Sequence, residues 1–202
     1  MGNRRMKSLK LNGIVVGEFL GSDDREEEIQ AFRDALKAKG LYNPPTLAMA
    51  MRGQADQFAY VANDAFVKLM ENSKRPGQII PASPFVVNAA FSLELYLKTL
   101  LVLSNGKPWG HELLKLYDAL PDNLKADLQS EAQKLAPTQG EMPDVQMRDM
   151  LAMLNESFEE WRYVYELPRS GEIHFRKTIL AMHACREVCN RAVTAVPKPV
   201  KA

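Results

Sequence analysis

The chain has 202 residues, of which 46% are hydrophobic and 25% charged, and its formal net charge is +1 at pH 7. These values are typical of a globular protein with a full hydrophobic core, and they exclude a chain whose overall charge attracts nucleic acid. Binding to nucleic acid would therefore require a local basic patch. No apolar leader opens the sequence, so we expect a cytoplasmic protein.

The first 40 residues combine a basic segment, a β-prone segment and one helix. Met1–Lys10 carries four basic residues and no acid. We interpret it as a solvated tail, with contact to phosphates as the alternative. Leu11–Leu20 is rich in β-branched residues and interrupted by glycines, which predicts one short edge strand or a hairpin. Ser22–Asp24 offers N-cap residues ahead of three glutamates, and Gly40 predicts the end of the helix.

Two long helices are expected next. Thr46–Asn72 places apolar residues at three- and four-residue steps, the pattern of a helix with one buried face. Pro84–Leu103 is mostly apolar and about long enough to cross a bilayer, but it contains Asn88, Glu94 and Lys98. A charged side chain in a lipid-facing helix costs roughly 3 kcal/mol. We therefore expect the central helix of a bundle and no membrane span.

The last hundred residues predict four further helices. The first two are short, at His111–Leu120 and from Asp122 to about Ala136. Two longer helices are expected at Asp144–Leu167 and Ile173–Val196, and their short connection predicts an antiparallel helical hairpin. The chain is therefore expected to be all-α, an antiparallel bundle of about seven helices with one short N-terminal strand or hairpin.

Three local patterns, in this order along the chain, resemble the HEPN superfamily. They are FSLELYLKTLL at Phe91–Leu101, GHELLKLYDALP at Gly110–Pro121, and WRYVYE at Trp161–Glu166. The resemblance implies a HEPN-like helical bundle over residues 81–196. Residues 1–80 would then form an N-terminal extension with two helices that pack on the core, and residues 197–202 a disordered tail.

The resemblance also implies a homodimer and, for many members, a metal-independent endoribonuclease of prokaryotic defence or toxin–antitoxin systems. Catalytic members carry an arginine and a histidine with four to six residues between them, near a helix start, and Arg169 and His174 match this pattern. Such a histidine can take the ribose 2′-hydroxyl proton, while the arginine stabilises charge on the phosphate. A second match is Arg176 with His183. The alternative is a non-catalytic binding or adaptor module for a partner protein or nucleotide.

A polar cluster is expected close to these patterns. Glu94 and Lys98 stand one helical turn apart, as do Arg162 and Glu166. The functional interpretation is that the four side chains line a groove. The structural interpretation is that their ion pairs fix the register of the helices. His111, at a predicted helix start, is expected to cap that helix or pack against it.

Neither a metal site nor a cofactor is expected. Cys185 and Cys189 lie one helical turn apart, which is a poor geometry for a disulfide. His183 lies two residues before Cys185 and therefore on a different face of the helix, which leaves too few ligands for zinc. We therefore expect two buried thiols.

Overall fold

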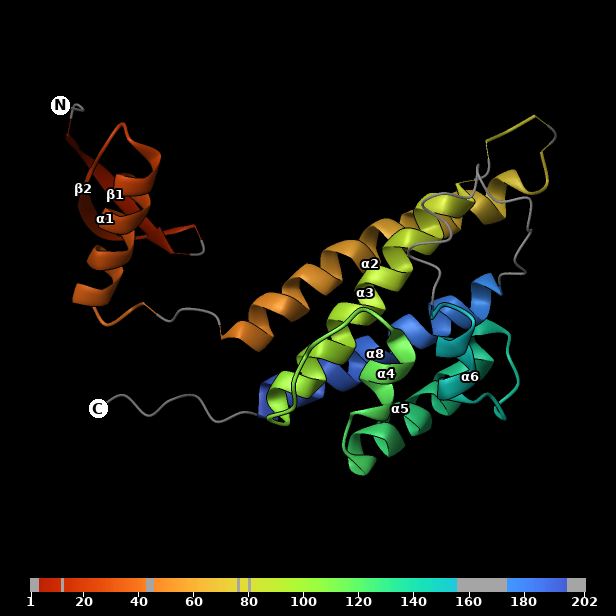
Figure 1. Cartoon of the computed structure of the whole chain (residues 1–202). Coiled ribbons are helices and arrows are strands. Elements are labelled where there is room, and N and C mark those ends of the chain that lie inside the picture. The colour runs from red at the N-terminus through yellow and green to blue at the C-terminus, as the bar shows by residue number, and fades with distance from the viewer. Residues whose placement is uncertain are drawn as a thin grey trace. The chain divides into compact units, whose positions relative to one another are not determined.

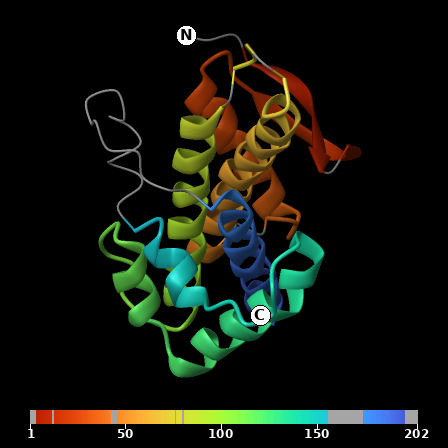
Figure 2. The same ribbon diagram turned by 90° about the vertical axis from the view of Figure 1, so that its right-hand side faces the viewer.

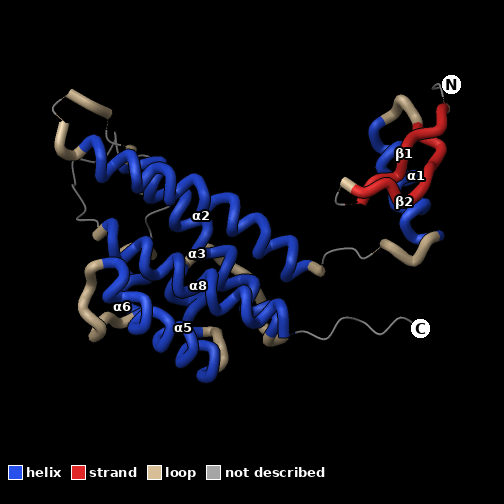
Figure 3. Tube along the Cα trace, turned by 180° about the vertical axis from the view of Figure 1, so that it is seen from behind, coloured by secondary structure: helices blue, strands red, loops and turns tan. Residues whose placement is uncertain are grey.

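The computed structural model of the chain describes residues 4–11, 13–42, 46–75, 77–79, 81–155 and 174–195. The chain divides into two compact units, Met1–Pro45 and Thr46–Ala202. Among the described residues, strands occur in the first unit and the second unit is helical (Figure 3). The division lies earlier in the chain than the boundary after residue 80 that the resemblance predicts. The predicted tail at residues 197–202 falls outside the described ranges.

In the first unit, a helix covers one face of a β-hairpin. Strand β1 (Arg5–Leu11) pairs antiparallel with β2 (Ile14–Gly21), which confirms the hairpin alternative. Gly13 in the turn has a φ of 82°, a left-handed conformation that glycine adopts without strain. Helix α1 (Arg25–Ala38) contacts the hairpin around three buried side chains, Leu9, Phe19 and Leu36.

The prediction of a solvated N-terminal tail is wrong, because most of the basic segment belongs to β1. Leu9 in this strand is fully buried. The ammonium group of Lys7 forms an ion pair with the carboxylate of Glu28 on α1 at 2.5 Å. Side chains of a strand point alternately to its two faces, so only about half of the residues in a short strand can point toward the core. One leucine among the basic residues therefore anchors the strand.

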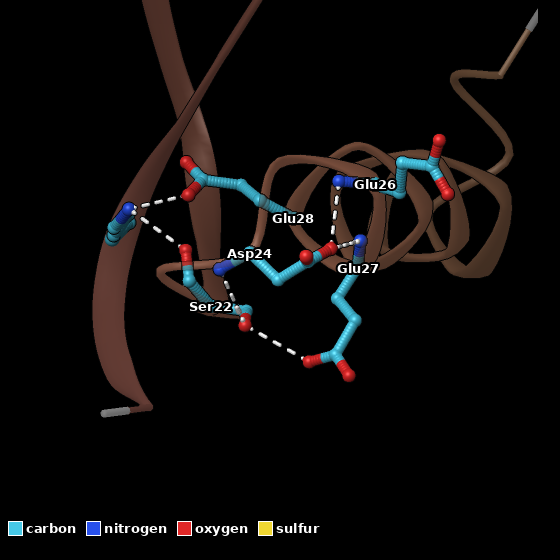
Figure 4. A network of polar contacts seen from close by, with 6 residues as sticks. Ser22, Asp24, Glu26, Glu27 and Glu28 are labelled. Carbon is cyan, nitrogen blue, oxygen red and sulfur yellow. Dashed lines mark hydrogen bonds and ion pairs between the residues drawn. The ribbon is translucent and has the colours of Figure 1, made fainter. Parts of the chain in front are cut away.

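The helix start predicted at Ser22–Asp24 is confirmed. Asp24 is the N-cap of α1, and its Oδ1 accepts hydrogen bonds from the backbone N–H groups of Glu26 and Glu27, both at 2.9 Å (Figure 4). The hydroxyl of the buried Ser22 donates to Glu27 Oε2 at 2.9 Å. The cap satisfies N–H groups that the first turn leaves without helical partners, and the glutamates lie at the positive end of the helix dipole.

The second unit is built on long helices. α2 (Leu47–Asn72) and α3 (Ala82–Leu103) lie side by side (Figures 1 and 2), and α8 (Phe175–Ala195) packs against both. The N-terminal extension was expected to contribute two helices to the core. The second of these, α2, packs on α3, whereas α1 packs on the hairpin of the first unit. Small side chains on α2 allow the two helix backbones to approach closely: Ala55, Ala59, Ala62 and Ala65 are buried.

α3 is the central helix of the second unit, as predicted. It is long and apolar enough to cross a membrane, but 61% of its most apolar window is buried inside the bundle. Its fully buried side chains include Leu93, Leu97 and Leu100. A helix covered by protein on most sides is apolar nearly all round for that reason, as in the core of a soluble bundle.

Shorter helices complete the bundle. They are α4 (Leu113–Asp118), α5 (Asp122–Leu135), the 3-10 helix η1 (Ala136–Gln139) and α6 (Met147–Ala152). α5 packs on α8, and α4 packs on α3 and α6. The described part of the chain thus contains seven α-helices and one short two-stranded sheet, which confirms the expected fold class.

The helix predicted over Asp144–Leu167 is interrupted. α6 ends at Ala152, and a turn follows through Asn155. Oδ1 of Asn155 accepts a hydrogen bond from the backbone N–H of Leu114 at 2.9 Å, so this side chain satisfies a donor in the first turn of α4. Residues 156–173 lie outside the described part, and so does the predicted connection to the last helix.

Candidate functional site

Of the predicted catalytic pair, the structure describes the histidine. His174 immediately precedes α8, and its side chain is exposed. Its carbonyl oxygen accepts the backbone N–H of Thr178 at 3.0 Å, which begins the helix. Arg169 lies outside the described residues. The histidine therefore stands at a helix start, as the resemblance implies, and its imidazole is accessible from solvent.

A cavity of about 390 Å³ opens beside the start of α8. Lys177, one helical turn after His174, lines it together with α6 and the loop before α6. Its apolar lining comes from four side chains, of which Val145 and Met150 are buried. The acidic residues Glu141, Asp144 and Asp149 line it as well. These acidic residues outnumber the one lysine of the lining.

The second arginine–histidine match contacts two different parts of the bundle. The guanidinium of Arg176 lies against the turn at Gly140, where an added Cβ would stand 2.7 Å from its Nη1. His183 is half-buried two turns further along α8, and its Nε2 lies 3.2 Å from Oδ1 of Asn63 on α2. Burial, and next the charge of Arg186, lower the pKa of His183. His183 is therefore a neutral group that links α8 to α2.

The structure brings together two of the four residues of the predicted polar cluster and adds a third that was not predicted. Glu94 on α3 is buried, with 7% of its side chain exposed. Its Oε1 accepts a hydrogen bond from Lys98 Nζ at 2.7 Å and lies 3.0 Å from His111 Nδ1. Arg162 and Glu166 lie outside the described residues. Glu94, Lys98 and His111 are called the Glu94 cluster below.

The expectation that His111 caps a helix or packs against it is wrong. The N-cap of α4 is Glu112, and 78% of the His111 side chain is exposed. A carboxylate only accepts hydrogen bonds, so the contact with Glu94 places the ring proton on Nδ1. In that tautomer Nε2 carries a lone pair, and most of the side chain is exposed to solvent. The Glu94 cluster can therefore accept a proton or hydrogen bond from a ligand.

A second carboxylate-centred cluster was not predicted. Asp56 on α2 accepts a hydrogen bond from the hydroxyl of Tyr96 on α3 at 2.7 Å. It also pairs with Arg52 on its own helix at 2.9 Å and with Arg186 on α8 at 3.3 Å. Burial, and next the hydrogen bond to Asp56, raise the pKa of Tyr96. These four residues, called the Asp56 cluster, join three helices. The one signal in the sequence was the four-residue spacing of Arg52 and Asp56.

Both cysteines are buried in α8, as predicted. Burial raises the pKa of each thiol well above its ordinary value, so neither is a reactive thiolate at neutral pH. The thiol of Cys189 donates to the carbonyl oxygen of Tyr96 at 3.2 Å. Within the described ranges, no three His, Cys, Asp or Glu side chains are grouped so that they could hold a metal ion.

No protein family model, curated protein or solved structure matches this chain. The expected relationship to the HEPN superfamily therefore depends on its three sequence patterns. Two of these patterns lie in described residues, one in α3 and one around α4. One residue of each pattern takes part in the contact between Glu94 and His111.

Proposed function

We propose that this chain is a HEPN-like bundle protein that cleaves RNA without a metal ion, with Arg169 and His174 as its catalytic pair. The observation that supports this function is the exposed position of His174 at the start of α8. An imidazole in that position can be reached by the ribose of a bound RNA strand. A histidine buried among apolar side chains could not be reached by the ribose and could not act as the general base.

In this reaction the 2′-hydroxyl proton passes to the imidazole of His174. The 2′-oxygen forms a bond to phosphorus, the bond from phosphorus to the 5′-oxygen breaks, and the leaving oxygen takes a proton from solvent. The products are a 2′,3′-cyclic phosphate and a 5′-hydroxyl end. The guanidinium of Arg169 stabilises the negative charge that develops on the phosphate oxygens.

In the proposed cytoplasmic homodimer, the two protomers juxtapose their copies of the pair, and the setting is a prokaryotic defence or toxin–antitoxin system.

The three histidines of the chain supply a matched test, because each has a different environment. We expect His174→Ala to lower the cleavage rate by at least about 100-fold, the usual contribution of a general base. His183→Ala, which removes the link to α2, is expected to keep the rate within a few-fold. Initial rates on fluorescently labelled RNA in EDTA, with detection of the cyclic phosphate, measure the effect. Equal rates for wild type and His174→Ala, or no cleavage by either, would contradict the proposal.

His111→Ala tests a competing assignment within the same function. The ring of His111 is oriented by Glu94 and is mostly exposed, so it is also a candidate for the general base. If cleavage depends on His111 and not on His174, the reaction class stands and the predicted catalytic pair is wrong. If both variants cleave like wild type, neither His174 nor His111 is the base, and the proposed catalytic pair is wrong.

A second candidate is a non-catalytic module that binds a partner protein. It is favoured by a row of exposed apolar side chains along α2, those of Met49, Tyr60 and Val67. Their spacings of 11 and 7 residues correspond to about three and two helical turns, so they share one face. Exposed aromatic and apolar side chains on one face are typical of protein interfaces. A Tyr60→Arg variant that converts a dimer to a monomer in sedimentation velocity would show that this face is an interface, and it supports this candidate if wild type does not cleave RNA.

A further inference from the structure

Trp109, the one tryptophan in the described part of the chain, lies two residues before His111 of the Glu94 cluster. Trp109 belongs to the loop between α3 and α4, and 79% of its surface is exposed. Tryptophan is usually largely buried, because its indole ring is the largest apolar side chain. Gly110, with a φ of 88°, follows it and makes the turn that leads to His111. The loop therefore displays an aromatic ring and an imidazole two residues apart.

The loop is anchored to the central helix. The 3.0 Å contact between His111 Nδ1 and Glu94 Oε1 ties it to α3, and Glu94 is held in turn by Lys98. At the other end of the loop, the first turn of α4 is fixed by the hydrogen bond from Leu114 to Asn155. A binding group that is already held in place loses little conformational entropy when a ligand arrives.

The charge around the loop favours an anion. Three lysines, Lys98, Lys107 and Lys115, lie on or next to the loop, with two carboxylates, Glu94 and Glu112. Lys98 and Lys115 are paired with these carboxylates, which leaves the exposed Lys107 as the excess positive charge. This balance is opposite in sign to that of the cavity beside α8.

We propose that Trp109, His111 and Lys107 form a subsite for one unpaired ribonucleotide. The base stacks on the indole of Trp109, the ribose 2′-hydroxyl donates to Nε2 of His111, and the ammonium of Lys107 attracts the phosphate. The proposal rests on the proposed function in taking RNA as the ligand, and it assigns a binding role to residues outside the predicted catalytic pair. A paired base is already stacked in its duplex, so the subsite selects single strands. The bond to His111 distinguishes RNA from DNA.

The test uses the full chain with Trp161→Phe, so that Trp109 is the remaining one of the two tryptophans. His174→Ala is added to prevent cleavage during the measurement. We expect single-stranded decauridylate to quench the Trp109 fluorescence saturably, and a duplex of the same length to leave it unchanged. Duplex RNA that quenches as strongly as the single strand would overturn the subsite.

Affinity variants test the individual contacts. Stacking contributes about 1–3 kcal/mol per base, so Trp109→Ala should raise the Kd for labelled decauridylate about tenfold in fluorescence anisotropy. Ile79→Ala shortens an equally exposed apolar side chain in the loop before α3 and should leave the Kd unchanged. His111→Ala should weaken RNA binding to the level of the matched single-stranded DNA, without changing the affinity for DNA. A loss of folding alone would weaken both.

The outcomes for binding and cleavage are separable. If wild type binds decauridylate through Trp109 but does not cleave RNA, the subsite stands and the proposed ribonuclease function fails. If wild type cleaves RNA and Trp109→Ala has the wild-type Kd and KM, the ribonuclease stands and the subsite is overturned. If the fluorescence of Trp109 responds to no single-stranded RNA, the inference is wrong.

Discussion

The two carboxylate-centred clusters of the bundle differ in where their partners come from. Asp56 is held by side chains of three long helices, including Tyr96 on α3 and Arg186 on α8. Glu94 is held on one side by its own helix and on the other by His111, which lies on a loop and is mostly exposed. A carboxylate bound by helices fixes their packing. A carboxylate that binds a loop residue presents that residue to solvent, so a role in ligand binding is expected for the Glu94 cluster.

The largest effect on stability is expected at Asp56. Asp56→Ala leaves the buried hydroxyl of Tyr96 and two guanidinium groups without their acceptor, so the free energy of unfolding should fall by about 2 kcal/mol. Asp64→Ala is the matched control, since Asp64 is an aspartate of the same helix that pairs with Lys68 on the surface. That change should stay within about 0.5 kcal/mol. Urea unfolding followed by circular dichroism measures the stability of both variants. Equal urea midpoints for Asp56→Ala and Asp64→Ala would show that the Asp56 cluster does not stabilise the packing of the helices.

A smaller effect on stability is expected at Glu94. Glu94→Gln keeps the shape of the side chain but removes the charge that pairs with Lys98, which should cost about 1 kcal/mol. The change should also weaken the hold on His111, so the fluorescence response of Trp109 to decauridylate should decrease. Glu112→Gln, an exposed pair partner of Lys115 next to the same loop, is the control and should leave both measurements unchanged. A loss at Glu94 as large as that at Asp56 would mean that both clusters serve packing alone.

The smallest effect on stability is expected at His183, which lies on helix α8, whereas His111 lies on a loop. The pKa of His183 is lowered in the folded protein, so below about pH 6.5 the unfolded chain binds a proton that the folded chain does not. Stability is therefore complete above that pH and decreases as the pH falls through the interval between the unfolded and folded pKa values. Urea midpoints of His183→Gln should fall less steeply with decreasing pH than those of wild type. Parallel profiles would show that His183 does not contribute.

The helices could be predicted because their signals lie within a few residues of each other. Asp24 accepts from the N–H groups two and three residues ahead, and Thr46 Oγ1 accepts from the N–H of Met49 at 3.2 Å. The cap at Asp24 was predicted from residue type and position alone, and Thr46 was predicted as the start of the next helix. The apolar run of α3 likewise identified the central helix. The Lys98–Glu94 pair was predicted for the same reason, since the two residues are one turn apart.

The sequence by itself thus determined the helical class, the caps and the contacts within single turns. Only the tertiary structure decided that His111 contacts Glu94, that Asn155 accepts the backbone N–H of Leu114, and that Tyr96 and Arg186 meet at Asp56. These pairs are 17 to 130 residues apart in the chain, and a one-dimensional pattern carries no information on which helix faces meet. The physical reason is that a buried polar group requires a partner but does not specify which segment provides it. The candidate site depends on these long-range contacts.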